Sequence, residues 1–388
     1  MTPSRTIAIA GAGIGGLTAA LALAAKGFRV TVFEKAERLE EVGAGLQLSP
    51  NASRILIAHG IAEHLGARAI SPRSVTIMTA RSGGEVTRLS LTANARPDAP
   101  YWLVHRADLQ AALLAEVRRR SEIELRLDTP VDSFETTPHD IRIGDLTASA
   151  LIGADGAWSA VRSNCFPGMT PQFSGLIAWR GSCDAAALPN DVRPSGVQLW
   201  MGPRAHLVVY PMSAGQRINA VAIIPGASIA PGWNAPGLSD DINLQFSQAG
   251  WPANARAMIA AIENWGRWPL YTMPDGGAWH SGRIALLGDA AHAMVPFAAQ
   301  GAGMAIEDAA VLAQCLGGTK IDDDIPAALA RYAALRQPRV TRVQRTARQQ
   351  GQIYHLQGPM AFARDMAMRL LGPQRLQARQ DWIYNWRV

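Results

Sequence analysis

The feature that most constrains the fold is a glycine-rich turn between an apolar strand and an apolar helix near the start of the chain. Thr6–Ala10 form an apolar run of strand length, and residues 17–25 are strong helix formers. Between them, Gly11 permits a tight turn, Gly13 lets a pyrophosphate approach the backbone, and Gly16 lets helix and strand pack closely. The predicted phosphate-binding residues are Gly11, Gly13, Ile14, Gly15 and Gly16. The sequence therefore predicts an α/β fold whose Rossmann-like parallel sheet binds a dinucleotide at this turn.

An acidic residue follows the next predicted strand, Phe28–Phe33. Glu34 lies twenty-three residues after Gly11, where a carboxylate can accept hydrogen bonds from both hydroxyls of an adenosine ribose. Because an acid at this position disfavours a 2′-phosphate, the tightly held adenosine is expected to be unphosphorylated. Lys35 belongs to the same predicted site.

The apolar stretch at residues 7–25 has two other interpretations, a signal peptide and a membrane span. Gly11 and Gly15 even form a GxxxG pair. Four glycines within the stretch, a largely Ala remainder and a correctly spaced acid after the next strand disfavour both interpretations. We therefore expect a soluble, cytoplasmic protein.

Length and cysteine content narrow the class further. A chain of 388 residues is long for one hydrophobic core, so two domains are expected. Cys165, Cys183 and Cys315 are odd in number, far apart and without CxxC spacing. This pattern argues against a disulfide framework, suits a reducing compartment and leads us to expect no metal.

The net charge of +6 comes from the C-terminal part of the chain. Residues 331–388 contain eleven Arg, no Lys and two acidic residues, whereas the first 330 residues are slightly acidic. Five of these arginines, from Arg336 to Arg348, recur every third residue and so step about 60° around a helix instead of forming one phosphate-facing stripe. The pattern predicts a solvated or interdomain helix and disfavours nucleic-acid binding.

The order of predicted elements divides the chain. A hairpin at residues 74–89 precedes a helix over Val104–Val117, and antiparallel strands between residues 175 and 224 precede helices near residues 240–249 and 254–264. The expected division is a discontinuous nucleotide domain (1–72, 100–172 and 272–340), an inserted antiparallel-sheet substrate domain (73–99 and 173–271), and a C-terminal helical segment (341–388).

Two further acids end predicted strands. Asp155-Gly156 closes an apolar strand, and Gly288-Asp289 closes another. Soon afterwards, Gln300–Met304 open a helix whose free N–H groups suit the negative charge that a reduced flavin accumulates. Asp289 can accept hydrogen bonds from a ribityl chain. With the first turn, these signatures predict a site for FAD.

On these motifs the chain resembles the single-component, FAD-dependent aromatic hydroxylases of the para-hydroxybenzoate hydroxylase superfamily, over nearly its whole length. The matching motifs are Gly11–Gly16, Leu151–Gly156 with Ser159 and Arg162, and Gly288–His292 through Glu307–Ala309. Closer similarity is to the salicylate, 3-hydroxybenzoate and 6-hydroxynicotinate hydroxylases. It is carried by Val42–Asn51, Ala178–Gly181 and His206–Pro211.

The resemblance implies a role for each cofactor residue. Glu34 would hold the adenosine ribose, and Arg106 and Asp289 the FAD phosphate and ribityl region, although Arg106 also suits a surface ion pair. Asp155-Gly156 would serve both FAD and a transient NADH or NADPH. The flavin itself would lie against Gly45, Leu46, Gln47, Gly301, Ala302, Gly303 and Met304, with Pro296 beside the reactive carbon on which the family forms a hydroperoxide.

His206 and Tyr210 are the predicted catalytic side chains. They lie four residues apart on a predicted strand, so they project from one face. A neutral His can accept a phenolic proton, and Tyr can position the ring or relay that proton. The subgroup resemblance places this face over the flavin. The alternative is an ordinary His and Tyr on a half-buried sheet.

Three other polar residues have competing interpretations. Gln300 is a predicted substrate contact or a loop amide that caps its neighbours, and His292 is expected to be structural. Arg180 is the candidate cation for a substrate carboxylate, with Arg204 as second choice.

The sequence thus predicts an FAD-dependent monooxygenase, monomeric or homodimeric, that uses NAD(P)H and O2 to hydroxylate a phenolic or hydroxy-heteroaromatic acid through a flavin C4a-hydroperoxide. The alternatives are an epoxidase, a halogenase or a reductase of the same fold, and a non-catalytic flavin-binding regulator.

Overall fold

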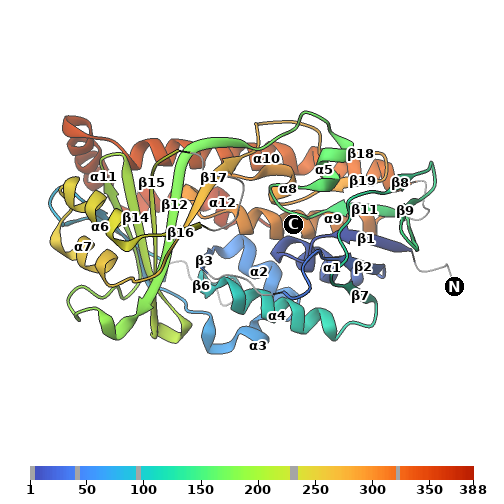
Figure 1. Ribbon diagram of the computed structural model, residues 1–388, viewed down its shortest axis with the longest axis horizontal. Helices are drawn as coiled ribbons and strands as arrows, with labels where there is room; N and C mark the ends of the chain where they lie inside the picture. The colour runs from blue at the N-terminus through green and yellow to red at the C-terminus, as the bar shows by residue number, and fades with distance from the viewer. Residues whose placement is uncertain (1–4, 40–43, 93–97, 228–234, 320–323) are drawn as a thin grey trace.

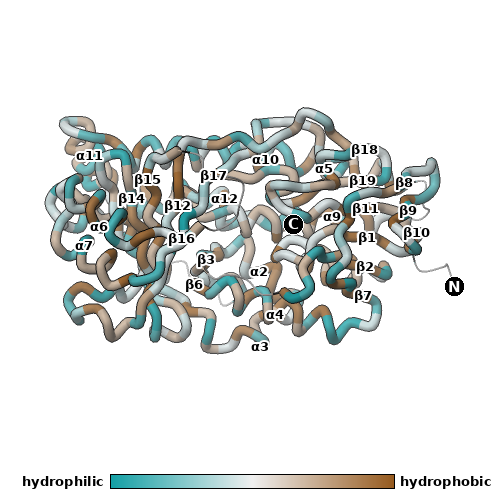
Figure 2. Tube along the Cα trace, viewed as in Figure 1, coloured by the Kyte–Doolittle hydropathy of each residue, from teal (hydrophilic) through white to brown (hydrophobic). Residues whose placement is uncertain are grey.

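Two large β-sheets lie along the long axis of the molecule, and one long helix, α10 (Ile325–Tyr354), runs past both of them (Figure 1). The structure is a computed structural model that describes residues 5–39, 44–92, 98–227, 235–319 and 324–388. Hydrophobic residues gather on the central strands of both sheets (Figure 2).

The first sheet has six strands in the order β18-β19-β11-β1-β2-β7. Their bounds are β1 (Thr6–Ala10), β2 (Arg29–Phe33), β7 (Ile123–Arg126), β11 (Ala150–Gly153), β18 (His280–Ser281) and β19 (Ile284–Leu286). All neighbours pair in parallel except β18, which is antiparallel to β19 at one edge. The first strand is buried on both faces, as expected for a parallel sheet covered by helices.

Helix α1 (Ile14–Ala24) is buried along most of its length between α9 (Gly301–Gly317) and α4 (Arg106–Arg118). The predicted strand, turn and helix at residues 6–25 are therefore confirmed as part of the hydrophobic core. Within the described ranges, no helix combines the length and apolar character needed to cross a bilayer.

The second sheet has eight strands in the order β16-β17-β12-β15-β14-β13-β4-β5. Their bounds are β4 (Ser74–Thr79), β5 (Glu85–Ser90), β12 (Gln172–Asp184), β13 (Val197–Gly202), β14 (Ala205–Met212), β15 (Arg217–Pro225), β16 (Ala235–Gly237) and β17 (Trp265–Thr272). Leu207 and Val209 on β14 pack in one hydrophobic core with α6 (Ser239–Gln248) and α7 (Ala253–Ala260). Since side chains alternate along a strand, residues 206, 208 and 210 face the opposite way.

The remaining elements are short or lie toward the C-terminus. They are β3 (Gly45–Leu48), β6 (Trp102–His105), β8 (Glu135–Thr136), β9 (Ile141–Ile143), β10 (Leu146–Ala148), α2 (Pro50–Ala58), α3 (Ile61–Leu65), α5 (Ala160–Cys165), α8 (Asp289–His292), α11 (Gly358–Ala378) and α12 (Asp381–Tyr384).

The structure differs from the sequence-based expectation at two boundaries. The helix predicted over Val104–Val117 begins at Arg106, because Val104 and His105 pair with β3 as part of β6. The domain boundary expected at residue 340 falls inside α10, which continues to Tyr354. The expected division of the chain into domains stays a prediction.

The Arg-rich segment forms α10, and its arginines are not all solvated. Arg336 is 1% exposed, whereas Arg345 is largely exposed. Its course past both sheets (Figure 1) fits an interdomain helix, and its exposed arginines leave it partly solvated.

Candidate functional site

A cavity of about 570 Å³ lies between the two sheets. It is bordered by the loops that follow β1, β2, β11 and β19, at the carboxyl edge of the parallel sheet, where ligands of such folds bind. The face of β14 and β15 forms the opposite side. All the predicted site residues line this cavity except Gly16, Arg204, Gln300, Gly303 and Met304. The structure therefore brings together motifs that are up to 290 residues apart in the sequence.

The turn after β1 has the geometry that a pyrophosphate needs. Gly11 has a φ of +102°, and a Cβ atom there would lie 2.5 Å from the carbonyl oxygen of Ala154. A Cβ atom at Gly16 would overlap the carbonyl oxygen of Gly11, which explains why Gly16 supports the turn without lining the cavity. In contrast, a Cβ atom at Gly13 would meet nothing within 4 Å. The space in front of Gly13 therefore allows a ligand to approach the backbone closely.

The carboxylates around the cavity also fit a dinucleotide. Glu34 accepts hydrogen bonds from the backbone N–H groups of Ala12 (2.8 Å) and Ala36 (3.0 Å), which fix its side chain at the end of β2. A carboxylate has about four acceptor sites, so Glu34 keeps capacity for ribose hydroxyls. Asp155 accepts from Val161 N (3.2 Å) through Oδ2, while its buried Oδ1 has no hydrogen-bond partner among the described residues.

The start of α9 forms another part of the cavity wall. Gly301 and Ala302 line the cavity, and the N-cap residue Gln300 makes no side-chain hydrogen bond to the helix start. A helix start without a side-chain cap offers N–H groups and partial positive charge to a ligand. Pro296 and the exposed Asp289 lie along the same wall. The cavity thus fits both the adenosine end and the flavin end of FAD.

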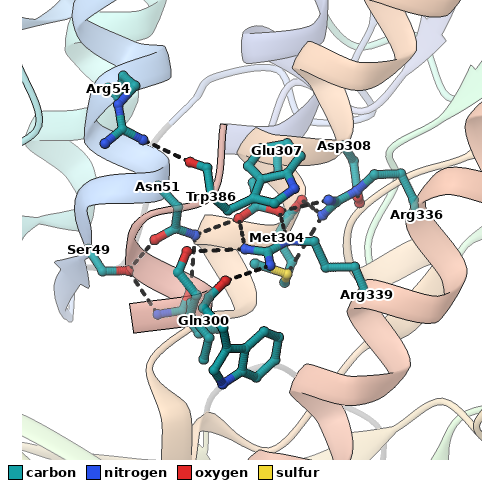
Figure 3. Close-up of polar contacts among 12 residues, drawn as sticks. Ser49, Asn51, Arg54, Gln300, Met304, Glu307, Asp308, Arg336, Arg339 and Trp386 are labelled. Atoms are coloured by element: carbon teal, nitrogen blue, oxygen red, sulfur yellow. Dashed lines mark hydrogen bonds and ion pairs between the residues drawn. The ribbon is translucent and has the colours of Figure 1, made fainter. Parts of the chain in front are cut away.

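Gln300 does not point into the cavity. Its side chain is 2% exposed; its Oε1 accepts from Asn51 Nδ2 (3.2 Å), and its Nε2 donates to Ser49 Oγ (2.8 Å) (Figure 3). The structure therefore favours the loop-amide alternative over the expected substrate contact. Gly303 and Met304 also lie behind the cavity wall, because this side of the first turn of α9 faces α2 and the core.

A buried charge network anchors α9 to α10 (Figure 3). Glu307, which is 0% exposed, accepts from Asn51 Nδ2, Arg336 Nη1 and Arg339 Nε, each at 2.7 Å. Asp308 accepts from Arg336 Nε at 2.7 Å and contacts His292 Nε2 at 2.6 Å. Burial alone would raise the pKa of the Asp308 carboxyl, but His292 and Arg336 outweigh it and lower that pKa to about 2. His292 is thus structural, as expected.

His206 and Tyr210 project from one face of β14 into the cavity, so their predicted common orientation is confirmed. The Tyr210 ring packs against the backbone of Gly45, where a Cβ atom would lie 2.7 Å from the hydroxyl. Gly45 N in turn donates to Asn219 Oδ1 at 2.8 Å, which ties β3 to the second sheet. Burial raises the pKa of the Tyr210 hydroxyl, so the hydroxyl stays protonated and can donate a hydrogen bond.

The His206 side chain has a partner that the sequence did not indicate. Its Nδ1 lies 2.8 Å from Nε2 of His355, at the C-terminal end of α10. Burial, together with His355, lowers the pKa of His206 well below its usual value, which keeps the ring neutral at pH 7. The two residues are 149 positions apart, and no spacing or motif links them. Only the packing of α10 against β14 brings them together.

Of the two candidate cations, only Arg180 reaches the cavity. Its guanidinium lies over the Trp268 ring at 5.5 Å, and its buried Nε has no hydrogen-bond partner within the described ranges. Arg204 lies exposed in the turn between β13 and β14. Arg106, at the first residue of α4, lines the same cavity as Arg180.

Comparison with known proteins agrees with an FAD-binding fold. The FAD binding domain family matches residues 4–347. The chain is 33% identical over 387 residues to the 3-hydroxybenzoate 6-hydroxylase of Klebsiella oxytoca, covering 98% of this chain and 96% of the relative. It is 38% identical over 389 residues to the 3-amino-4-hydroxybenzoate 2-monooxygenase PtnB3 of Streptomyces platensis, with the same two coverages.

A solved structure of a salicylate hydroxylase substrate complex superposes with a TM-score of 0.83 at 26% identity, covering 100% of this chain and 97% of that one. The similarity that the sequence motifs indicated is thus confirmed at the level of the family and of the fold. Val42 and Gly43 of those motifs lie outside the described residues. The chain belongs to the FAD binding domain family.

Proposed function

We propose that the protein hydroxylates the ring of a small phenolic or hydroxy-heteroaromatic acid, using FAD, O2, and NADH or NADPH. The observation that carries this proposal is a single cavity with nucleotide-binding turns on one side and His206, Tyr210 and Arg180 on the other. Relatives over nearly the whole chain are named as hydroxylases of hydroxybenzoates, which supports the substrate class. When bound, FAD takes two electrons from the nicotinamide and transfers one oxygen atom of O2 to the ring.

His206 prepares the ring for attack. Its neutral imidazole presents Nε2 on the cavity side, since Nδ1 is bonded to His355. Taking the phenolic proton makes the substrate oxygen more phenolate-like and the ring carbons more electron-rich. Tyr210 keeps its own proton and can hold the substrate oxygen in place by donating a hydrogen bond.

Arg180 holds the carboxylate of the acid. Burial, and to a lesser extent Arg106, lower the pKa of Arg180, because two like charges face one partly desolvated space. An anionic ligand group relieves this repulsion, and a guanidinium binds a carboxylate through two parallel hydrogen bonds. Val208, Val221 and Ile223 provide an apolar surface for the ring on the same side.

The nicotinamide cofactor docks only transiently in this proposal. The sequence has one glycine-rich dinucleotide turn, and FAD binds at that turn and at Glu34. The enzyme is proposed to work in the cytoplasm, because Cys165, Cys183 and Cys315 are all free. Cell fractionation with an antibody against the protein tests the location.

The reaction is tested by following NADH and NADPH oxidation with a panel of aromatic acids that includes salicylate, 3-hydroxybenzoate and 6-hydroxynicotinate. We expect one acid to stimulate oxidation about tenfold or more and to be recovered with one added hydroxyl group. Oxidation that yields only peroxide, or that no aromatic acid stimulates, would contradict the proposal. Removal of FAD, checked by the flavin absorbance, should abolish the activity, and added FAD should restore it.

A further inference from the structure

The buried His206 side chain bonds to a second histidine that lies nearer the surface. His206 Nδ1 and His355 Nε2 are 2.8 Å apart, so one of these two nitrogens carries the hydrogen and the other accepts it. Each ring therefore sets the tautomer of the other.

The two remaining ring nitrogens face different surroundings. Neither His206 Nε2 nor His355 Nδ1 makes a hydrogen bond to the described part of the protein. His206 is 2% exposed and lines the cavity, whereas His355 is partly exposed at the end of α10. The pair thus connects the cavity, where a substrate hydroxyl would lie, with the solvent outside.

The aromatic rings packed against the pair carry no charge, and Arg364, which donates to the Tyr354 carbonyl, is paired with Asp365. Phe297 and Tyr354 lie edge-on to the His206 ring, with centroid separations of 5.1 and 5.6 Å. Burial raises the pKa of the Tyr354 hydroxyl and lowers the pKa of His355 to about 4, so both are neutral at pH 7. A neutral pair can take up a proton at one end and release one at the other without itself becoming charged.

We propose that His355 relays the substrate proton from His206 to solvent. As the phenolic O–H bond breaks, His206 Nε2 takes the proton, and the proton on His206 Nδ1 moves to His355 Nε2. The proton on His355 Nδ1 then leaves to water. One proton enters and one leaves, both rings end neutral with exchanged tautomers, and the reverse path resets them when the product oxygen is reprotonated. This inference rests on the proposed function, because it needs a phenolic substrate at His206.

The test measures proton release without turnover. Oxidised, FAD-loaded enzyme is mixed with salicylate, 3-hydroxybenzoate or 6-hydroxynicotinate in weak buffer containing a pH indicator, and no NAD(P)H is added. The wild type is expected to release one proton per bound probe. His355→Gln keeps an amide that can hydrogen bond to His206 but cannot pass a proton on. We expect it to slow release about tenfold or more, with the probe Kd within about threefold of the wild type.

Free imidazole is expected to restore the rate of His355→Gln, because the site is partly exposed. Tyr354→Phe, which keeps the ring contact with His206, is the matched control and should release protons at the wild-type rate. Unchanged release in His355→Gln, slowed release that imidazole fails to restore, or no release by the wild type on binding would each overturn the relay.

A second measurement uses only the wild type and so does not depend on the folding of a variant. The rate of proton release in mixtures of H2O and D2O is expected to curve with the deuterium fraction, because more than one proton moves in the relay. A straight line would contradict the relay. The proposed function is contradicted by a different result, namely that no aromatic acid of the panel binds or stimulates NAD(P)H oxidation.

Discussion

The two sides of the cavity are built in different ways. The backbone wall consists of the turns at Gly11–Gly16 and Asp155-Gly156 and the start of α9, where main-chain groups and missing side chains make room for a ligand. The side-chain wall consists of Arg180, His206 and Tyr210 on β12 and β14. Because one wall works by shape and the other by functional groups, changes in the backbone wall should act on folding and FAD retention. Changes in the side-chain wall should act on turnover.

The largest effect is expected behind the backbone wall, at the charge network that anchors α9. Glu307→Leu leaves the buried Arg336 with Asp308 as its remaining charged partner, and removing one partner of a buried ion pair costs about 3–5 kcal/mol. Chemical denaturation should show this loss in the free energy of unfolding. The matched control is Asp275→Ala, which removes the exposed pairs with Arg345 and Arg348 and should cost about 1 kcal/mol or less. Equal losses in the two variants would argue against the network as the anchor.

The next effect separates folding from cofactor binding within the backbone wall. Gly16→Ala places a methyl group against the carbonyl of Gly11 and should destabilise the protein by about 3 kcal/mol. Gly13→Ala meets no protein atom within 4 Å, so the apoprotein should unfold at the wild-type denaturant concentration. It should still weaken FAD binding about tenfold, measured by fluorescence titration, because the methyl group occupies the path to the backbone. If Gly13→Ala bound FAD with the wild-type affinity, the turn would not be part of the FAD-binding site.

In the side-chain wall, His206→Ala is expected to lower aromatic-dependent hydroxylation by about 10² or more while FAD stays bound. The loss reflects the missing acceptor for the phenolic proton. Product formation, measured by chromatography alongside the flavin absorbance, checks both parts of the expectation. Unchanged turnover would show that His206 takes no part in the reaction. Loss of FAD would show that a change in the side-chain wall also affects cofactor binding.

Arg180→Met should raise the KM for the aromatic acid about tenfold or more, because a hydrogen bond between charged groups contributes about 1.5–3 kcal/mol. The corresponding aromatic amide lacks the carboxylate charge, so its KM should differ little between the wild type and the variant. Steady-state kinetics with both compounds makes the comparison. An equal rise for acid and amide would show that Arg180 supports the wall and does not recognise the carboxylate.

The smallest effect is a pH dependence of stability. His206 and His355 have a lowered pKa in the folded protein, so the unfolded chain binds protons more readily between its own pKa near 6.5 and the folded value. The free energy of unfolding should therefore have its full value above about pH 6.5 and fall as the pH approaches 4. In His355→Gln the loss of unfolding free energy over this pH range should be smaller by about 1 kcal/mol, measured by denaturation at several pH values. The same slope in both proteins would contradict the lowered pKa of His355.

The backbone wall could be predicted closely from the sequence. Its glycines and acids lie at the ends of strands, and their roles follow from the spacing of strand, turn and helix at Thr6–Glu34. The common face of His206 and Tyr210 could also be predicted, because side chains alternate along a strand and this alternation depends only on neighbouring residues. The orientation of Gln300 could not, since an amide at a helix start can turn either way, and contacts with Ser49 and Asn51 decide it.

Short-range patterns in the sequence are enough to predict the first sheet, the dinucleotide turn, the family and the strand that carries His206 and Tyr210, because each pattern consists of residues that are close together in the chain. Tertiary structure alone decided that Arg336 is buried beside Glu307, and that His355 reaches His206 across 149 positions. Such pairs depend on how α10 packs against both sheets, and side chains far apart in the sequence leave no periodic signal of that packing.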